Sequence, residues 1–238
     1  MKLKIIGSGS MASVNNSASY LLDGIIAIDM PNGFCKNVKK LNLNLEKIEN
    51  VLITHFHGDH YFDLPFYFYA LSKKENKTTN IYLNKRNIKK IKKLFKLAFP
   101  NSMKGMKKNI QINYINKKTF KINDYEVEKV LVSHGNLKPA FGYIITNNSV
   151  KIGFTGDSSY CDQIEYMASI CDYLICDCSF KLGDDKHMGI DNIVDMAERY
   201  KNHKFIVSHM SDATRNEIEK TKLENIIIPN DGDLIEII

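Results

Sequence analysis

A group of histidines with one aspartate follows a short apolar strand, and it constrains this chain more than any other feature. Residues 51–54 are rich in apolar and β-branched side chains, which is typical of a buried strand. Four potential metal ligands follow within six residues: His55, His57, Asp59 and His60. Side chains two positions apart in extended backbone point the same way, so His55 and His57 can bind one ion, while the other two face a second position. Imidazole and carboxylate ligands suit zinc, manganese or iron.

The pattern His-x-His-x-Asp-His after a buried strand resembles the signature of the metallo-β-lactamase superfamily. Three later apolar segments end in suitable ligands, at His134, Asp157 and His209, in the order that the superfamily requires. The resemblance implies two metal positions that share one carboxylate: His55, His57 and His134 at the first, Asp59, His60 and His209 at the second, and Asp157 bridging both. It implies two divalent ions, zinc preferred over manganese or iron, with a hydroxide between them as the nucleophile.

Length and composition indicate a globular protein. With 238 residues, 44% hydrophobic and 25% charged, the chain can bury a substantial core. We find neither a signal peptide nor an apolar run long enough to span a bilayer, so we expect no membrane partner. Five cysteines without zinc-ribbon spacing suggest reduced thiols in a cytoplasm. The net charge of +6 fits an anionic substrate but does not identify one.

Apolar periodicity predicts strands first and then strands alternating with helices. The expected strands are 3–6, 18–22, 25–29, 51–54, 110–115, 125–133, 141–146, 150–154, 173–178, 204–208, 225–228 and 234–238. The expected helices are 34–41, 62–73, 161–169, 190–201 and 212–220, with helical spacing also within 85–108. We see no linker and expect one hydrolase domain over 1–238. The resemblance implies an α/β fold, the four-layer αβ/βα sandwich, with two mixed β-sheets, helices outside and metals at one edge between the sheets.

The motif Lys186-His187-Met188-Gly189 opens the helix expected at 190–201. Its placement resembles the additional histidine of the phosphodiesterase branch, which includes ribonuclease Z and cyclic nucleotide phosphodiesterases. In that branch the histidine stabilises the scissile phosphate and protonates the leaving oxygen. Asp177 resembles the acidic residue that orients this histidine, although the family usually has glutamate after a histidine and here aspartate follows a cysteine. We therefore predict His187, Asp177 and Asp59 as catalytic residues, because a carboxylate partner favours the imidazolium form of His187.

The spacing of the motifs narrows the substrate. In the branch, tRNA 3′-end endonucleases usually carry a long arm between the third and fourth metal motifs, whereas only 23 positions lead from His134 to Asp157 here. We therefore expect a binuclear phosphodiesterase for a small phosphodiester or nucleotide, such as a cyclic nucleotide or a cyclic ribose phosphate. The alternatives are an RNA endonuclease of the tRNA 3′-processing type, a glyoxalase II-like thioesterase or other ester hydrolase, and a non-catalytic, metal-bearing nucleic-acid-binding protein.

Three further segments carry expectations. Segment 85–108 has ten Lys or Arg and no acid, and we interpret it as a solvated helix face, with attraction of RNA or another phosphate-bearing ligand as the alternative. The aromatic stretch 61–69 is expected to be core or the contact of a homodimer. Gly7-Ser8-Gly9-Ser10 lacks a following P-loop lysine, so we expect a tight loop at the mouth of the site.

Overall fold

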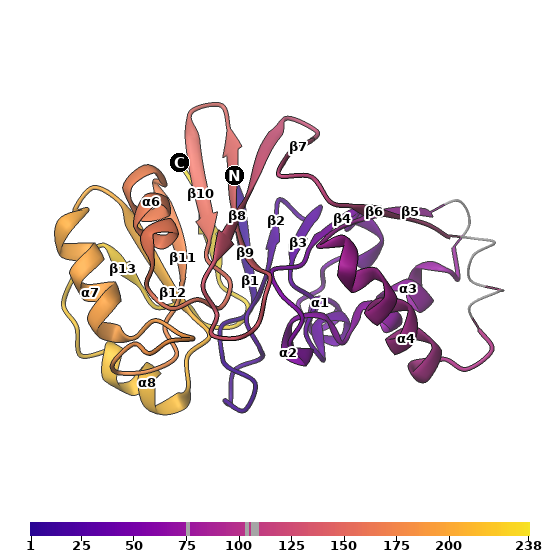
Figure 1. Ribbon diagram of the computed structural model, residues 1–238, viewed down its shortest axis with the longest axis horizontal. Helices are drawn as coiled ribbons and strands as arrows, with labels where there is room; N and C mark the ends of the chain where they lie inside the picture. The colour runs from indigo at the N-terminus through magenta and orange to yellow at the C-terminus, as the bar shows by residue number, and fades with distance from the viewer. Residues whose placement is uncertain (75–76, 103–104, 106–109) are drawn as a thin grey trace.

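Two mixed β-sheets face each other at the centre of the protein (Figure 1). The computed structural model describes residues 1–74, 77–102, 105 and 110–238. Over these residues, the first sheet has the spatial order β14 (Leu234–Glu236), β1 (Lys2–Gly7), β2 (Ser19–Leu22), β3 (Ile26–Ile28), β4 (Asn50–Leu52), β5 (Lys77–Tyr82) and β6 (Ile110–Ile115). The second has the order β13 (Ile226–Ile227), β12 (Lys204–Ser208), β11 (Tyr173–Asp177), β10 (Val150–Phe154), β9 (Ala140–Asn147), β8 (Tyr125–Val132) and β7 (Thr119–Ile122).

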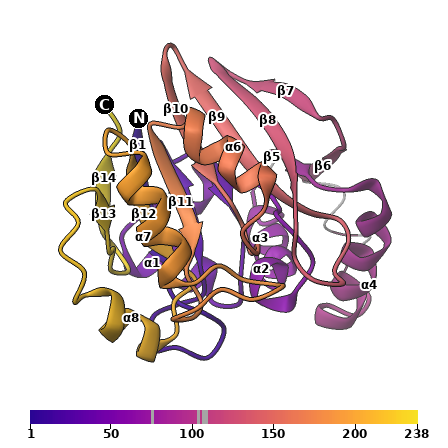
Figure 2. The same cartoon turned by 60° about the vertical axis from the view of Figure 1, so that its left-hand side comes forward.

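Helices cover the outer face of each sheet, as Figures 1 and 2 show from two sides. Along the first sheet and its loops lie α1 (Phe34–Lys40), α2 (Gly58–Tyr61), α3 (Leu64–Leu71) and α4 (Ile88–Ala98), with 3-10 turns at Leu45–Lys47 and Lys85–Asn87. The second sheet carries α6 (Asp162–Ile170), α7 (Ile190–Arg199) and α8 (Asp212–Ile218). Among the described helices, none is both long and apolar enough to cross a bilayer.

Three apolar layers hold these elements together. The layer between the sheets combines side chains of both, such as Ile5 and Leu52 from the first and Tyr143 and Ile206 from the second. A second layer packs α1, α3 and α4 against the first sheet, and a third packs α6, α7 and α8 against the other. Each sheet thus buries both faces, which is the predicted four-layer sandwich.

The direction of the strands decides where polar side chains meet. Strands β3 and β4 are parallel neighbours, and so are β10, β11 and β12. Carboxyl ends of parallel strands lie at the same edge of a sheet, and ligand sites of α/β sheets form there. The residues that follow these strands, including His55, Asp157, Asp177 and His209, are therefore brought to one edge.

Most predicted elements are confirmed, and the differences have local causes. The helix expected at 62–73 is the shorter α3, which begins at Leu64 because Pro65 suits the first turn of a helix, and a separate helix, α2, precedes it within the histidine motif. The helical spacing in 85–108 gives α4, which ends at Ala98 shortly before Pro100, a residue that cannot continue a helix. The parts of that segment at 103–104 and 106–108 lie outside the described residues. Strands β5 and β7 were not predicted, because Lys77–Tyr82 and Thr119–Ile122 are largely polar.

Tyr143 links the second sheet to the strand that carries the histidine motif. Its hydroxyl donates to the carbonyl oxygen of Ile53 at 2.8 Å, and its ring is fully buried. We expect Tyr143→Phe to lower the free energy of unfolding by about 1–2 kcal/mol, because a buried carbonyl loses its donor. Urea unfolding followed by circular dichroism measures this. Tyr166→Phe is the control, since Tyr166 is 46% exposed and should change stability by less than about 0.5 kcal/mol. Equal effects of the two changes would contradict the prediction.

Candidate metal centre

The structure brings the first predicted group of ligands together. His55 and His57 follow β4, His134 follows β8, and Asp157 follows β10, and one ligand atom of each lies within 4.8 Å of all the others. His57 Nδ1 lies 3.1 Å from His55 Nε2 and 3.2 Å from His134 Nε2. Three ring nitrogens therefore converge on one point. His57 is exposed while the other three are buried, so this group is accessible from the His57 side.

The second group forms directly beside the first. Ligand atoms of Asp59, His60 and His209 lie within 4.8 Å of one another. Asp157 Oδ2 is 3.4 Å from His60 Nε2, 3.4 Å from His209 Nε2 and 3.6 Å from His55 Nε2, so this carboxylate faces both groups. His60 Nε2 and His209 Nε2 are buried and have no hydrogen-bond partner. Each such orphan costs about 1–3 kcal/mol unless something binds it.

The outward nitrogens of four histidines explain why the inward ones are free to act as ligands. In each ring Nδ1 faces an oxygen, and the partners are Thr54 Oγ1 for His55 (3.1 Å), Asp29 Oδ2 for His60 (2.7 Å), the Lys186 carbonyl for His134 (2.8 Å) and Ser179 Oγ for His209 (2.8 Å). An Nδ1–H that donates outward leaves the Nε2 lone pair pointing inward, the tautomer that metal ligands adopt. The two groups of imidazoles and carboxylates thus fit divalent cations.

Asp29 is the supporting residue that sequence reasoning missed. Its buried carboxylate accepts from the Thr54 backbone N–H (2.8 Å) and hydroxyl (2.7 Å) as well as from His60. A signal was present, because Asp29 ends the apolar segment 25–29, and that strand runs parallel to β4. Asp29 therefore fixes both the start of the histidine motif and the orientation of one candidate ligand.

Charge and burial act in opposite directions on the candidate ligands. Burial lowers the pKa of His60, but the carboxylates of Asp157 and Asp29 raise it more, so the net pKa lies well above the ordinary value. His209 shows the same balance, and Asp157 with Asp59 raises its pKa to about 9. Burial raises the pKa of Asp157, while the surrounding imidazoles lower it well below its usual range. In such a site bound cations take the place of protons, so metal affinity falls as the pH falls.

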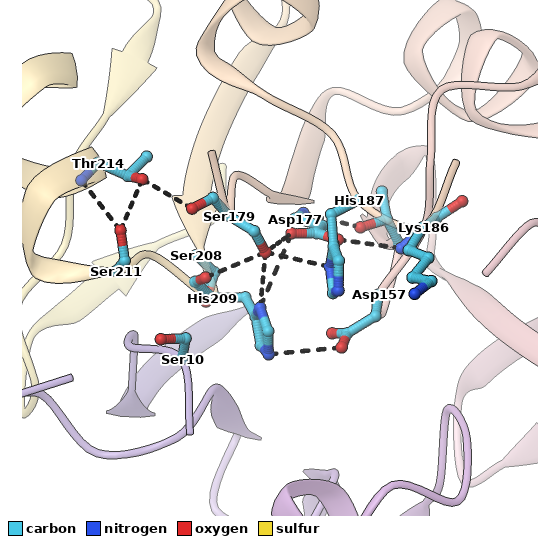
Figure 3. Close-up of polar contacts among 12 residues, drawn as sticks. Ser10, Asp157, Asp177, Ser179, Lys186, His187, Ser208, His209, Ser211 and Thr214 are labelled. Carbon is cyan, nitrogen blue, oxygen red and sulfur yellow. Dashed lines mark hydrogen bonds and ion pairs between the residues drawn. The ribbon is translucent and has the colours of Figure 1, made fainter. Parts of the chain in front are cut away.

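The predicted pair of His187 and Asp177 lies beside these two groups (Figure 3). His187 Nδ1 donates to Asp177 Oδ2 at 2.8 Å, and the Ser179 hydroxyl donates to the other oxygen of Asp177 at 2.6 Å. The ring of His187 stacks on that of His209, with centroids 5.3 Å apart. One ligand atom each of Asp157, His187 and His209 lie within 4.8 Å of one another. Burial lowers the pKa of His187, but the hydrogen bond and charge of Asp177 raise it above its ordinary value.

The loop Gly7–Ser10 contacts Met210, the residue after the candidate ligand His209. Ser10 donates its backbone N–H to the carbonyl of Met210 at 3.0 Å, and Gly9 forms a β-bridge with the same residue. His209 itself adopts φ 55°, a left-handed conformation that is uncommon for a residue other than glycine and is often found at functional sites. The loop therefore contacts the turn that aims His209 (Figure 3).

Comparison with known proteins identifies the class first. The fold is that of the metallo-β-lactamase proteins: YhfI from Bacillus subtilis, a metallo-β-lactamase fold protein, matches with a TM-score of 0.79 and 19% identity over 98% of each chain. The short form of human tRNase Z (ELAC1) matches with a TM-score of 0.76 and 17% identity, over 100% of this chain and 99% of that one.

The sequence defines the family more closely. A ribonuclease Z from Thermococcus sibiricus (strain DSM 12597 / MM 739) is 24% identical in an alignment that covers 90% of this chain and 87% of that protein. Residues 1–230 match the family described as Anti-Pycsar protein Apyc1, and the chain belongs to that family. It is thus a member of the metallo-β-lactamase hydrolases with relatives of the ribonuclease Z type.

Asp29→Asn should weaken metal binding without unfolding the protein. An amide that accepts from Thr54 turns its NH2 toward His60 Nδ1, which then accepts and moves the ring proton to the inward nitrogen. We expect affinity for zinc to fall about 10–100-fold, the usual effect of losing such a partner. Competition with a chromophoric chelator measures it. The control is Asp63→Asn, because Asp63 is similarly buried but accepts from the Cys35 backbone N–H (2.8 Å). Unchanged zinc affinity in Asp29→Asn would refute this role.

Proposed function

We propose that this protein is a metal-dependent phosphodiesterase that hydrolyses a small phosphodiester, such as a cyclic nucleotide. The observation that carries the proposal is the position of the His187–Asp177 pair next to two groups of candidate metal ligands. Hydrolysis of a thioester does not call for a protonated histidine beside the metals, because a thiolate departs without a proton. Cleavage of a phosphodiester does, because the leaving alkoxide needs a proton.

The proposed site would hold two divalent cations, with zinc preferred over manganese and iron. The ligands are those predicted from the sequence: His55, His57 and His134 on one side, Asp59, His60 and His209 on the other, and Asp157 between them. When bound, such ions lower the pKa of the attacking water and neutralise charge on the phosphate oxygens. The chain's part is to hold the imidazoles in one tautomer and to exclude bulk water from the buried carboxylate.

His187 is the proposed general acid. Its Nδ1–H is engaged by Asp177, so Nε2 is left for the substrate, and Asp177 raises the pKa of the ring above its ordinary value, which favours the protonated form. As the oxygen of water forms its bond to phosphorus and the bond to the leaving oxygen breaks, His187 gives its Nε2 proton to that oxygen. The positive ring also attracts the anionic phosphate. Asp177 and Ser179 act through His187 by fixing its orientation.

A short connection supports a small substrate. Between His134 and Asp157 the chain forms only a loop and the hairpin of β9 and β10, which pair from Val150 and Asn147 onward. In this fully described stretch there is no protruding arm of the kind that holds tRNA in the endonucleases of the branch. A small phosphodiester needs no such arm.

RNA is the second candidate substrate, and two observations favour it. One is the similarity to ribonuclease Z. The other is helix α4, whose described lysines form no ion pair with any described acid, while its apolar side packs Ile91 and Phe95 into the core. Lys90 of this helix lies over the ring of Phe56, with its ammonium 5.8 Å from the ring centroid. In the sequence Phe56 stands between His55 and His57. The positive face of α4 thus extends to the histidine motif.

A panel of substrates tests the proposal. Metal-loaded protein should cleave bis(p-nitrophenyl) phosphate and one or more cyclic nucleotides, and chelation should abolish cleavage. Processing of precursor tRNA without cleavage of cyclic nucleotides would establish the endonuclease instead. Cleavage of thioesters alone would establish a glyoxalase II-like enzyme, and nucleic-acid binding without any turnover would establish a binding protein.

Asp157→Ala should reduce turnover of bis(p-nitrophenyl) phosphate to background and lower the metal content. The reason is that this buried carboxylate faces both ligand groups. Metal analysis and initial rates are measured on the same preparation. Asp172→Ala is the matched control, since its carboxylate accepts from the Lys151 backbone N–H (2.7 Å) away from the site. A variant of Asp157 that keeps both metal and turnover would remove the bridging role.

His187→Ala should leave metal content near normal and lower kcat roughly 10²–10⁴-fold, the range for general acid catalysis. The loss should be largest for substrates with poor leaving groups, because p-nitrophenolate departs without a proton. His203→Ala serves as the control, since His203 stacks on Tyr200 and donates Nδ1–H to the Ala168 carbonyl (2.8 Å). An unchanged kcat with a poor leaving group would show that His187 is not the acid.

A further inference from the structure

The segment before His187 is fixed against both sides of the candidate site. The Lys186 carbonyl accepts from His134 Nδ1, and Asp184 Oδ1 accepts the backbone N–H groups of Lys186 and His187, each at 2.8 Å. Gly135, next to His134, donates its N–H to the Asp185 carbonyl at 3.0 Å. The position of Lys186 is therefore set by the same contacts that orient a candidate ligand and the proposed acid.

The side chain of Lys186 packs against the backbone of Gly135. Its aliphatic part covers Gly135, where an added Cβ would lie 2.8 Å from Lys186 Cγ and 3.3 Å from Cε. Figure 3 shows it extending from the loop on the side where Asp157 and the His187 ring lie. Lys186 is an exposed residue, and its ammonium forms no ion pair with any described acid, whereas Lys181 in the same segment pairs with Glu217 at 3.5 Å. An unpaired cation beside the site is available to an anionic substrate.

Phe180 contacts the ring of His187. Its ring is 45% exposed and meets the His187 ring edge to face, with centroids 5.6 Å apart and an interplanar angle of 89°. Its backbone is held by a hydrogen bond from the Ile190 N–H to the Phe180 carbonyl (2.9 Å). An exposed aromatic ring in a fixed position next to the proposed acid offers a surface on which a nucleobase can stack.

We propose that Lys186 and Phe180 are substrate-binding residues that make this site specific for nucleoside phosphodiesters. Lys186 binds a nonbridging oxygen of the phosphate, and Phe180 stacks on the base. The inference rests on the proposed phosphodiesterase function and extends it, because it selects a base-bearing diester over a cyclic ribose phosphate. The two contacts recognise different parts of the substrate. The ammonium contributes to binding of every phosphodiester, and the ring contributes only to binding of those with a base.

Steady-state kinetics with two substrates tests both contacts. The substrates are the best cyclic nucleotide of the panel and a base-free cyclic ribose phosphate. Lys186→Met keeps the aliphatic part and the backbone carbonyl, and it should raise KM about tenfold for both substrates, with kcat within about threefold and weaker dependence on salt. Phe180→Leu should raise KM about tenfold for the cyclic nucleotide alone, within the range for one lost base stack. Lys181→Met and Leu182→Ala, exposed neighbours, should leave both KM values unchanged.

The outcomes separate this proposal from the function on which it rests. No turnover of any diester by the wild-type protein would end the phosphodiesterase proposal itself. Turnover with equal KM in Lys186→Met and Lys181→Met would refute the phosphate contact. A rise in KM on both substrates for Phe180→Leu would make the ring structural and refute stacking. Calorimetry with inorganic phosphate on metal-loaded protein gives a second readout, in which Lys186→Met should bind about tenfold more weakly than Lys181→Met.

Discussion

The buried carboxylate of Asp157 is the group on which this structure depends. It lies between the inward nitrogens of His55, His60 and His209, all within 3.6 Å, and the residue is only 3% exposed. An isolated charge so deeply buried would be expelled or neutralised. It persists here because positive charge, carried by protons on the imidazoles or by divalent cations, surrounds it. The candidate ligands come from one segment of the first sheet, after β4, and from three of the second, after β8, β10 and β12, so the cluster also ties both sheets together.

The topology makes this convergence possible. Parallel strands in each sheet end at the same edge, and the two sheets present these edges to one another. The supporting residues come from the same places: Asp29 follows β3 beside the histidine motif, and Asp177 ends β11 between the strands that lead to Asp157 and His209. The strand ends thus position the candidate ligands, and the segment between β11 and α7 completes their orientation through Ser179 and the Lys186 carbonyl.

Most of the candidate ligands could be predicted from the sequence, because histidines and aspartates at the ends of apolar segments can be recognised without knowing the fold. The pairing of His187 with Asp177 was also predicted, and the structure places them 2.8 Å apart. What the sequence could not give are partners whose role exists only in three dimensions. The Ser179 hydroxyl and the Lys186 carbonyl belong to this kind, since any serine or any backbone carbonyl looks alike in a sequence. The homodimer, the single domain and the cytoplasmic location stay predictions.

One hydroxyl couples the proposed acid to a proposed ligand. Ser179 Oγ accepts from His209 Nδ1 and donates its only proton to Asp177, which in turn accepts from His187. A shift of either ring therefore disturbs the other. The segment from Phe180 to Lys186 adjoins this chain of hydrogen bonds. Its Asp184 carboxylate holds the backbone of His187, whereas the side chains of Phe180 and Lys186 take no part in these hydrogen bonds. These hydrogen bonds hold the residues proposed for catalysis, and the adjoining segment carries the residues proposed for substrate recognition.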